Sequence, residues 1–461
     1  MNFKVLLSSV AMASAITVSA ATAPRYVFYF IGDGMGVQPT LAAQAYCRIK
    51  GLDTPIMMQL PTMGMVTTHS ASSPVTDSAA AGTALSTGSK TKNSMLGMNA
   101  DSVAVESVAK KYQAKGYGIG IATNVYPDDA TPGAFFAHVP NRGMTTQIAK
   151  QAAESGYQFI GGSYLRGLKD RDGNDTGVLQ AFKDNNVDYV KGIKEARESK
   201  SEKVFMVYPD SIAHIANYTI DSIPGFVSLP DITQTCLDHL LKVSPDKFFI
   251  MIEGGNIDHA AHGDDGGTVI KDILNFNEGI QIAYDFYLKH PDETLIVVTA
   301  DHNTGGMSLG NSYLSYDAKP LYIDYQRISK DAFNDEMKAI QRSRRIYTWD
   351  DMKEYLSDKL GFWTSVPVSE KQTESLREKF EQTFVKKDGD EEKTLYNNFS
   401  GFTAAVYKVF NDICGFGWTT TYHTGDYVPV FAIGVGSQKF AGVIDNTEIP
   451  MYLEAVSYGH L

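Results

Sequence analysis

The stretch Arg25-Tyr-Val-Phe-Tyr-Phe-Ile-Gly-Asp-Gly-Met-Gly36 decides the fold of this chain. It begins as a nearly continuous apolar run and ends in a glycine-rich turn that carries one carboxylate, Asp33. An apolar run of this length is typical of a strand that is buried on both faces of a parallel sheet. Ligand-binding groups gather at the carboxyl ends of such strands. We therefore predict that Asp33 lies at the functional edge of a sheet.

Apolar runs of strand length recur at residues 117–123, 203–208, 247–252, 294–300 and 428–433. Stretches with helical character lie between them, at residues 102–114, 145–155, 231–243 and 275–288. Strands that alternate with helices in this way form a parallel sheet with helices on both faces. We predict an α/β fold with a doubly wound, mostly parallel sheet.

Residues 313–416 break this alternation. They are rich in charged and aromatic residues, and helical periodicity returns at residues 330–344, 349–360, 370–384 and 398–414. We predict a mostly helical insertion, or cap, between the last two sheet elements of an α/β domain that spans residues 24–461. Within this insertion, the charged run at residues 386–393 is expected to be a solvated loop.

The start of the chain is typical of a signal peptide. Lys4 precedes an apolar stretch that ends in Val18-Ser-Ala20, a small-residue cleavage pattern. We predict that residues 1–20 are removed and that the protein is periplasmic or secreted. No later apolar run has the length of a membrane span. The cysteines lie far apart, so buried free thiols are expected in place of a disulfide scaffold; they are Cys47, Cys236 and Cys414.

The composition limits the possible partners. The chain has 461 residues, 43% of them hydrophobic, and a formal net charge of −12 at pH 7. This is enough apolar material for one large core or two domains. The acidic balance, with no compensating cluster of Lys and Arg, argues against a nucleic-acid surface. Small anionic substrates remain compatible with it, because bound metal ions can reverse the charge locally.

The segment from Val75 to Lys90 contains a candidate nucleophile. Asp77 and Ser78 stand directly before an Ala-rich tract, so Ser78 is expected in the first turn of a helix. The free N–H groups and the helix dipole attract anions there, which suits a hydroxyl that attacks phosphate. The alternative is that Asp77 is simply an N-cap and that the small residues form a packing surface.

Carboxylates and imidazoles follow the apolar run at residues 247–252. Glu253 ends the run, and Asp258 and His262 come shortly after it. The last two are four residues apart and would share one helical face, so both could reach one metal ion. A hard carboxylate oxygen such as that of Glu253 suits Mg²⁺ better than zinc.

Similar side chains follow the run at residues 294–300 and precede the run at residues 428–433. They are Asp301 with His302, and His423. Asp129 and Thr131 form a further polar group, which Arg142 follows. A guanidinium can bind two phosphate oxygens as a fork, which lysine cannot do.

The other polar motifs are given structural roles. His259 is adjacent to a predicted ligand but would point away from the Asp258 face. The segment from Asp170 to Asp175 lacks the distal Glu of an EF-hand loop, so a surface turn is expected. Six histidines without carboxylate partners at strand ends are expected to be structural or surface residues: His69, His138, His214, His239, His290 and His460.

Taken together, these blocks resemble the alkaline phosphatase family. Six of them occur in the family's order, from Gly-Asp33-Gly-Met-Gly through Thr-Asp-Ser78-Ala-Ala-Ala-Gly-Thr-Ala to His423-Thr-Gly. The resemblance covers the sheet domain and says little about residues 313–416. It implies a hydrolase that cleaves small phosphate monoesters through a phosphoserine intermediate, and a homodimer is expected from it.

The resemblance also implies two zinc ions and one magnesium ion. Its zinc ligands match two sets of residues, Asp258, His262 and His423 for the first ion and Asp33, Asp301 and His302 for the second. Asp33 would also reach magnesium, which Glu253 and Thr131 complete with Asp129 close by. Ser78 matches the nucleophile, and Arg142 matches the phosphate clamp, with Asp77 as its orienting partner. His259 and Asp129 match positions that vary in the family and adjust the magnesium site.

Two rival functions are weighed against this interpretation. A phosphodiesterase, phosphomutase or sulfatase of the same superfamily is the nearest, but Ser72-Ser-Pro74-Val-Thr76 lacks the Arg of a sulfatase motif. Arg142 and the magnesium ligands favour a phosphate with three free oxygens over a diester. The other rival is an exported metal- or phosphate-binding protein with an idle site, which complete assignment of the catalytic roles disfavours.

Overall fold

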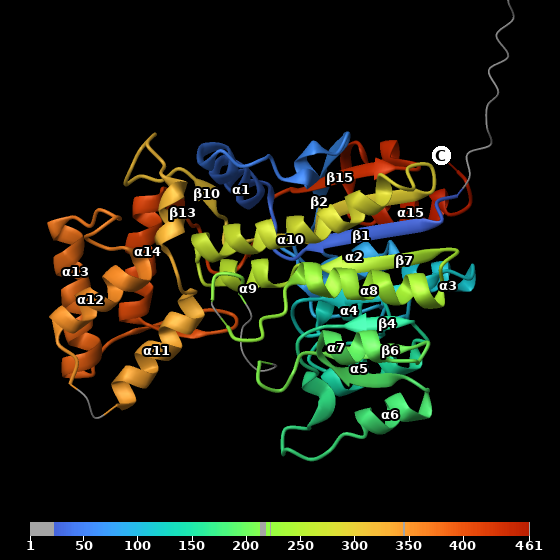
Figure 1. Ribbon diagram of the computed structural model, residues 1–461, viewed down its shortest axis with the longest axis horizontal. Helices are drawn as coiled ribbons and strands as arrows, with labels where there is room; N and C mark the ends of the chain where they lie inside the picture. The colour runs from blue at the N-terminus through green and yellow to red at the C-terminus, as the bar shows by residue number, and fades with distance from the viewer. Residues whose placement is uncertain (1–22, 213–217, 222, 344–345, 461) are drawn as a thin grey trace, which may run out of the picture.

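A computed structural model describes residues 23–212, 218–221, 223–343 and 346–460. A ten-stranded sheet forms its centre (Figure 1). In spatial order its strands are β16 (Gly442–Asp445), β2 (Thr62–Thr67), β15 (Val428–Gly434), β8 (Thr294–Ala300), β1 (Tyr26–Gly32), β7 (Phe248–Glu253), β3 (Gly118–Thr123), β4 (Phe159–Gly161), β6 (Val204–Val207) and β5 (Asp188–Lys191).

The strand β1 lies in the middle of this sheet because both of its faces are apolar. It pairs in parallel with β7 and β8, and all of its residues are buried. The Phe30 ring packs against Phe276 on one face, while Tyr29 packs against Phe135 on the other. Only β15 runs antiparallel to its neighbours β2 and β8. The predicted α/β fold with a mostly parallel sheet is confirmed.

Helices cover both faces of the sheet (Figure 1). One face carries α1 (Val37–Lys50), α7 (Gly192–Glu198), α8 (Leu229–Val243), α9 (Asn256–His262) and α10 (Gly266–Tyr287). The other carries α2 (Ser78–Thr87), α3 (Val108–Ala114), α4 (Ala130–Gly133), α5 (Thr145–Glu154) and α15 (Glu448–Val456). The short helix α6 (Val178–Asp184) packs on α5.

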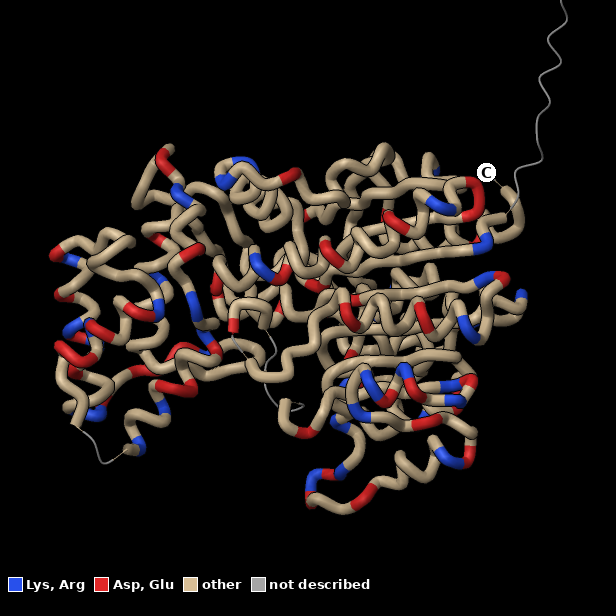
Figure 2. The backbone as a smooth tube through the Cα atoms, in the orientation of Figure 1, with Lys and Arg blue, Asp and Glu red and all other residues tan. Residues whose placement is uncertain are grey.

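The insertion forms a group of helices beside the sheet, with dense acidic and basic side chains (Figures 1 and 2). Its elements are α11 (Lys330–Arg342), α12 (Trp349–Leu360), α13 (Glu370–Phe380), a π-helical turn (Glu381–Lys386), the hairpin β11 (Glu391–Lys393) and β12 (Asn398–Ser400), and α14 (Gly401–Cys414). Phe380 contacts both Trp349 and Phe402, which gives the insertion an aromatic core. The chain enters through β10 (Ser308–Leu309) and leaves through β13 (Phe416–Gly417), which pair antiparallel.

Several predicted boundaries were wrong. Residues 386–393 are not wholly a loop, since β11 occupies 391–393, and residues 398–400 form β12 in place of the start of a helix. The insertion lies between β8 and β15, but β16 follows, so these are not the last two sheet elements. The sequence reading also missed β2, β4, β5 and β16. These strands are short or lie toward the outer parts of the sheet, where continuous apolar runs are not required.

Other expectations concern single segments. The three cysteines are buried free thiols, as predicted. Asp170–Asp175 is an exposed turn in which the Asp170 carboxylate accepts backbone N–H groups of Asp172 and Asn174. Within the residues that the structure describes, no helix is long and apolar enough to cross a membrane. The predicted signal peptide and His214 lie outside the described residues.

Candidate metal centre and nucleophile

Three neighbouring parallel strands, β1, β7 and β8, bring carboxylates to one edge of the sheet. In the register, Glu253 lies opposite Ile31, and the last residues of β1 and β8 lie opposite each other. Asp33 and Asp301 directly follow those last residues. The parallel pairing that the apolar runs produce therefore delivers three acids side by side.

Glycine is required after Asp33 because the backbone turns sharply beside α9. Gly34 has φ +72°, and a Cβ there would lie 2.9 Å from the Asp258 Cα. The Gly34 N–H also donates to Asp301 Oδ1 at 3.1 Å. A side chain at this position would push α9 away from the sheet edge.

The helix α9 and a small hairpin supply the imidazoles. Asp258 and His262 lie on α9, where Asp258 Oδ1 is 3.4 Å from His262 Nε2. The strand β14 (His423–Thr424) pairs with β9 (Asn303–Thr304), which stacks the ring of His423 on that of His302 at 3.6 Å. His262 Nε2 lies 3.1 Å from His423 Nε2. Residues from distant parts of the chain thus converge on one small volume.

Two groups of side chains have the spacing of a metal site: Asp33, Asp301 and His302, and Asp258, His302 and His423. Within each group the candidate ligand atoms lie within 4.8 Å of one another. His302 belongs to both groups, so the two positions adjoin. This arrangement can hold two cations a short distance apart.

The charges at this edge fit divalent cations. Burial, together with the carboxylates of Asp301 and Asp258, raises the pKa of Asp33 well above its usual value. In the described part of the chain, the buried atoms Asp33 Oδ1 and Asp301 Oδ2 accept no hydrogen bond. Buried carboxylate oxygens without hydrogen bonds are costly unless a cation meets them. The oxygen and imidazole donors are of the kinds that zinc and magnesium take.

The pKa shifts of Asp258 and His423 also favour the forms that bind a metal ion. Burial opposes ionisation of Asp258, but the adjoining imidazoles of His262 and His423 hold its pKa well below the usual range. Burial and the neighbouring His302 lower the pKa of His423 to about 3. A neutral imidazole is the form that binds a metal.

Glu253 lies deeper, on the β3 side of the edge. Burial raises its pKa to about 8, and its Oε2 accepts a hydrogen bond from Thr123 at 2.5 Å. Thr131 lies on α4, whose N-cap is Asp129. These oxygen donors lie next to the Asp33 group and lack an imidazole among them, which suits magnesium.

Ser78 is the first residue of α2, and 1% of its surface is exposed. Its Oγ lies 3.1 Å from His302 Nε2. Asp77 is the N-cap, and its Oδ1 accepts the Ala80 N–H at 3.0 Å. The capping role and the position of the hydroxyl at an anion-attracting helix start therefore coexist.

Arg142 lies at the mouth of the site, held by two acids. Its Nη2 donates to Asp129 Oδ1 at 2.9 Å, while Nη1 is 3.6 Å from Asp77 Oδ2. The nearer carboxylate is that of Asp129, whereas the family resemblance implied Asp77 as the orienting partner. Arg166 Nη2 also reaches Asp129 Oδ1, at 3.1 Å. Burial opposes ionisation of Asp129, but these two guanidinium groups hold its pKa below the usual value.

Sequence reasoning missed two residues of this site. Arg166 follows no strand-end motif, and its link to the site is the ion pair with Asp129, supported by stacking over Tyr126. Tyr396 comes from the insertion, and its hydroxyl donates to Asp258 Oδ2 at 3.2 Å. The ring centroid of His259 lies 4.2 Å from that of Tyr396, and the carboxylates of Asp258 and Asp129 interact with its imidazole.

Comparison with known proteins gives consistent matches. A family model described as alkaline phosphatase matches residues 24–172 and 166–458. Alkaline phosphatase 4 of Bacillus subtilis (strain 168) is 30% identical over 441 residues, which cover 92% of this chain and 87% of that protein. Alkaline phosphatase 3 of the same organism is 30% identical, with 92% and 87% covered.

Solved structures match over nearly the same length. A cold-active alkaline phosphatase from Shewanella sp. superposes with a TM-score of 0.76 at 26% identity, covering 94% of this chain and 99% of that one. The alkaline phosphatase of Thermus thermophilus also gives 0.76 at 26% identity, with 96% and 93% covered.

Proposed function

The chain belongs to the alkaline phosphatase family, and we propose that it hydrolyses phosphate monoesters through a phosphoserine on Ser78. The observation that carries this proposal is the Ser78 hydroxyl at the start of α2, 3.1 Å from His302 and beside the two candidate metal groups. Phosphoryl transfer needs positioning and charge neutralisation more than covalent assistance.

In the proposed reaction, Ser78 Oγ attacks phosphorus and the ester oxygen leaves as the alcohol. The free N–H groups at the start of α2 face the phosphoryl oxygens. Arg142 binds two of these oxygens as a fork, with its guanidinium held by Asp129 and Asp77. Water then attacks phospho-Ser78, which releases inorganic phosphate and restores the hydroxyl.

Metal ions are cofactors typical of this family, and the side chains present fit them. We assign one zinc to Asp258, His262 and His423, and a second to Asp33, Asp301 and His302. Magnesium is assigned to Asp33, Glu253 and Thr131, with Asp129 and His259 adjusting that site. When bound, these cations supply Lewis acidity that lowers the pKa of a contacting hydroxyl and offsets charge on the phosphoryl oxygens. All of these ligand residues except His423 are buried, so they limit the access of bulk water to this edge.

The test is the Ser78→Ala variant. Removal of the nucleophile is expected to lower kcat for phenyl phosphate by at least about 10³-fold. Zinc and magnesium content and the melting temperature should stay near those of the wild type. Acid-quenched wild-type enzyme should carry phosphate on the peptide that contains Ser78, as mass spectrometry detects. Full turnover by the variant would overturn the assignment.

Two controls separate the rival functions. A chelator should abolish hydrolysis, and added zinc and magnesium should restore it, whereas an idle binding protein shows no turnover in either state. Rates on phenyl phosphate should exceed those on a diester such as bis(phenyl) phosphate. Export of the protein after loss of residues 1–20 and assembly as a homodimer are further parts of the proposal, to be tested by N-terminal sequencing and light scattering.

A further inference from the structure

Tyr396 of the insertion reaches the candidate active site. It lies in the turn between β11 and β12, and its hydroxyl donates to Asp258 Oδ2 at 3.2 Å. Its ring centroid is 4.2 Å from that of His259 and 5.1 Å from that of His262. Its hydroxyl is bonded to the fully buried Asp258, yet 38% of Tyr396 is exposed. The hydroxyl is therefore enclosed while part of the side chain faces the approach to the site.

The turn itself is held in place from within. Thr394 N–H donates to the Asn397 carbonyl at 2.9 Å, and the Asn397 N–H donates back to Thr394 Oγ1 at 3.1 Å. Asn397 Nδ2 also donates to Asp331 Oδ1 on α11 at 2.5 Å. These bonds fix the residues on both sides of Tyr396, so its ring has little freedom to swing away.

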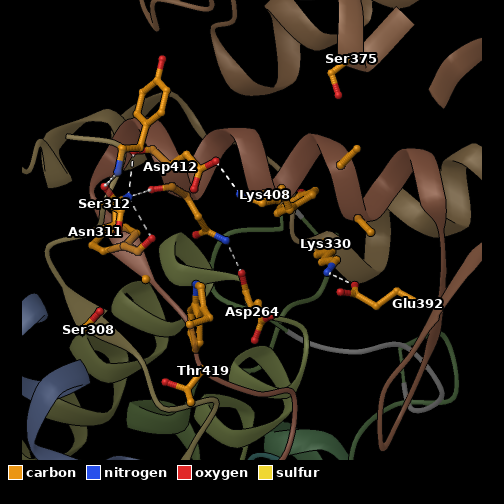
Figure 3. Close-up of a pocket in the computed structure, with 18 of the residues that line it drawn as sticks. Asp264, Ser308, Asn311, Ser312, Lys330, Ser375, Glu392, Lys408, Asp412 and Thr419 are labelled. Atoms are coloured by element: carbon orange, nitrogen blue, oxygen red, sulfur yellow. Dashed lines mark hydrogen bonds and ion pairs between the residues drawn. The ribbon is translucent and has the colours of Figure 1, made fainter. Parts of the chain in front are cut away.

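The hairpin is also tied to the helix that carries the metal ligands. Lys330 is 3% exposed, and its ammonium donates to Glu392 Oε2 on β11 at 2.6 Å and to the Gly263 carbonyl at 2.8 Å. Gly263 directly follows α9. Figure 3 shows the Lys330–Glu392 pair at the wall of a cavity of about 1310 Å³ between the insertion and the α/β domain. One buried lysine thus couples the position of Tyr396 to α9.

We propose that Tyr396 contacts the leaving group of the substrate and makes the site selective for monoesters with a planar aromatic leaving group. This inference rests on the proposed function. Arg142, Asp77 and Tyr396 are among the site residues that are partly exposed, so they lie at its opening. Arg142 holds the phosphoryl end, and the group attached to it extends toward the opening. An aromatic ring there favours an aromatic partner, because offset or edge-to-face ring pairs are attractive.

The test measures binding with phosphonates, which the enzyme cannot hydrolyse. Phenylphosphonate and methylphosphonate are titrated calorimetrically into metal-loaded wild type, Tyr396→Phe, Tyr396→Ala and the control Tyr316→Ala. Tyr316 is a fully exposed tyrosine of the same insertion. Wild type, Tyr396→Phe and Tyr316→Ala should bind the phenyl compound roughly three- to tenfold tighter than the methyl compound. In Tyr396→Ala this ratio should fall to about one.

An unchanged ratio in Tyr396→Ala would overturn the proposal. Equal weakening of both phosphonates, with loss of metal, would also overturn it, because Tyr396 would then act only on Asp258. Hydrolysis of phenyl phosphate and glycerol phosphate is measured alongside. If wild type hydrolyses neither compound, the proposed function fails while the binding ratio still reports on Tyr396. The two failures are therefore distinguishable.

Discussion

Two regions of the molecule bury several carboxylates, and they treat them differently. At the sheet edge, Asp33 Oδ1 and Asp301 Oδ2 accept no hydrogen bond in the described part of the chain. At the seam where the insertion meets α10, Asp265 accepts from Thr268 N–H and Oγ1, Gln326 Nε2 and Lys330 N–H. Asp33, Asp301 and Asp265 are all buried, so the difference between the two regions lies in the hydrogen-bond partners.

This comparison shows how a buried carboxylate with a structural role differs from one that is placed to bind a metal ion. At the seam, Asp221 accepts from both the N–H and the hydroxyl of Ser329, and Asp331 accepts from Tyr218. Such hydrogen bonds replace water and leave little need for an ion. At the edge the oxygens converge on one another and on imidazoles, which a cation satisfies. Within α10, Asp272 is the exception, since its buried Oδ2 has no hydrogen bond to the described residues.

The largest effect should come from exchanging one acid in each region for its amide. Asp301→Asn removes a charge from the proposed metal site, so kcat/KM for phenyl phosphate should fall by about 10³-fold or more, with less bound zinc. Asp221→Asn at the seam should keep kcat/KM within about threefold and should keep the bound metal. The amide of the new side chain can still form hydrogen bonds with Ser329. Kinetics and elemental analysis measure both. Equal loss of metal in the two variants would contradict the idea that only the acids at the sheet edge bind it.

The pH dependence of stability should expose the exception, Asp272. Burial raises its pKa to about 7, so the folded chain holds this proton more tightly than the unfolded chain. An acid with a raised pKa loses its contribution to stability as pH rises from its unfolded value toward its folded value. Between about pH 5 and about pH 7.5, wild type should lose about 2 kcal/mol of unfolding free energy relative to Asp272→Asn.

Urea titrations of the two proteins at both pH values provide the measurement. The comparison between variants cancels the titration of the sheet edge, because both proteins keep it. A constant difference across this pH range would mean that Asp272 is ionised in the fold and has a partner after all.

The smallest effect should come from helix caps in the two regions. Thr348 caps α12 in a capping box with Asp351, and Asp77 caps α2. Thr348→Ala and Asp77→Ala should each lower the unfolding free energy by about 1 kcal/mol. Only Asp77→Ala should also lower kcat/KM, because Arg142 loses a neighbouring carboxylate. An equal kinetic effect of Thr348→Ala would show that the insertion controls the reaction more widely than through Tyr396.

The candidate ligands at the sheet edge could be predicted from the sequence because each of them stands next to a clear strand or helix pattern. Asp33, Glu253 and Asp301 follow apolar runs, and parallel strands place such ends together. Ser78 was readable because Asp77 and the Ala-rich tract mark a helix start. The register, and with it the distances among the ligands, depends on pairing between residues far apart in the chain.

The residues at the seam and in the β11–β12 hairpin could not be assigned to the site from sequence in this way. Tyr396 lies in a polar turn whose sequence carries no periodicity, and its role depends on where the insertion docks. Arg166 reaches Asp129 only because β4 lies beside β3 in the sheet, and β4 is too short to predict. Lys330 is charged, so composition alone would place it at the surface, whereas a carboxylate and a carbonyl allow it to be buried.

The central place of β1 has a consequence for how a ribosome makes this protein. Its two partners, β7 and β8, emerge long after it, so β1 stays without these neighbours while residues 33–247 are made. Such distant pairing makes folding slow compared with that of a helical protein. His423 emerges later still, after both of these strands. Under the proposed function, a nascent chain would therefore begin to release phosphate only after His423 has emerged.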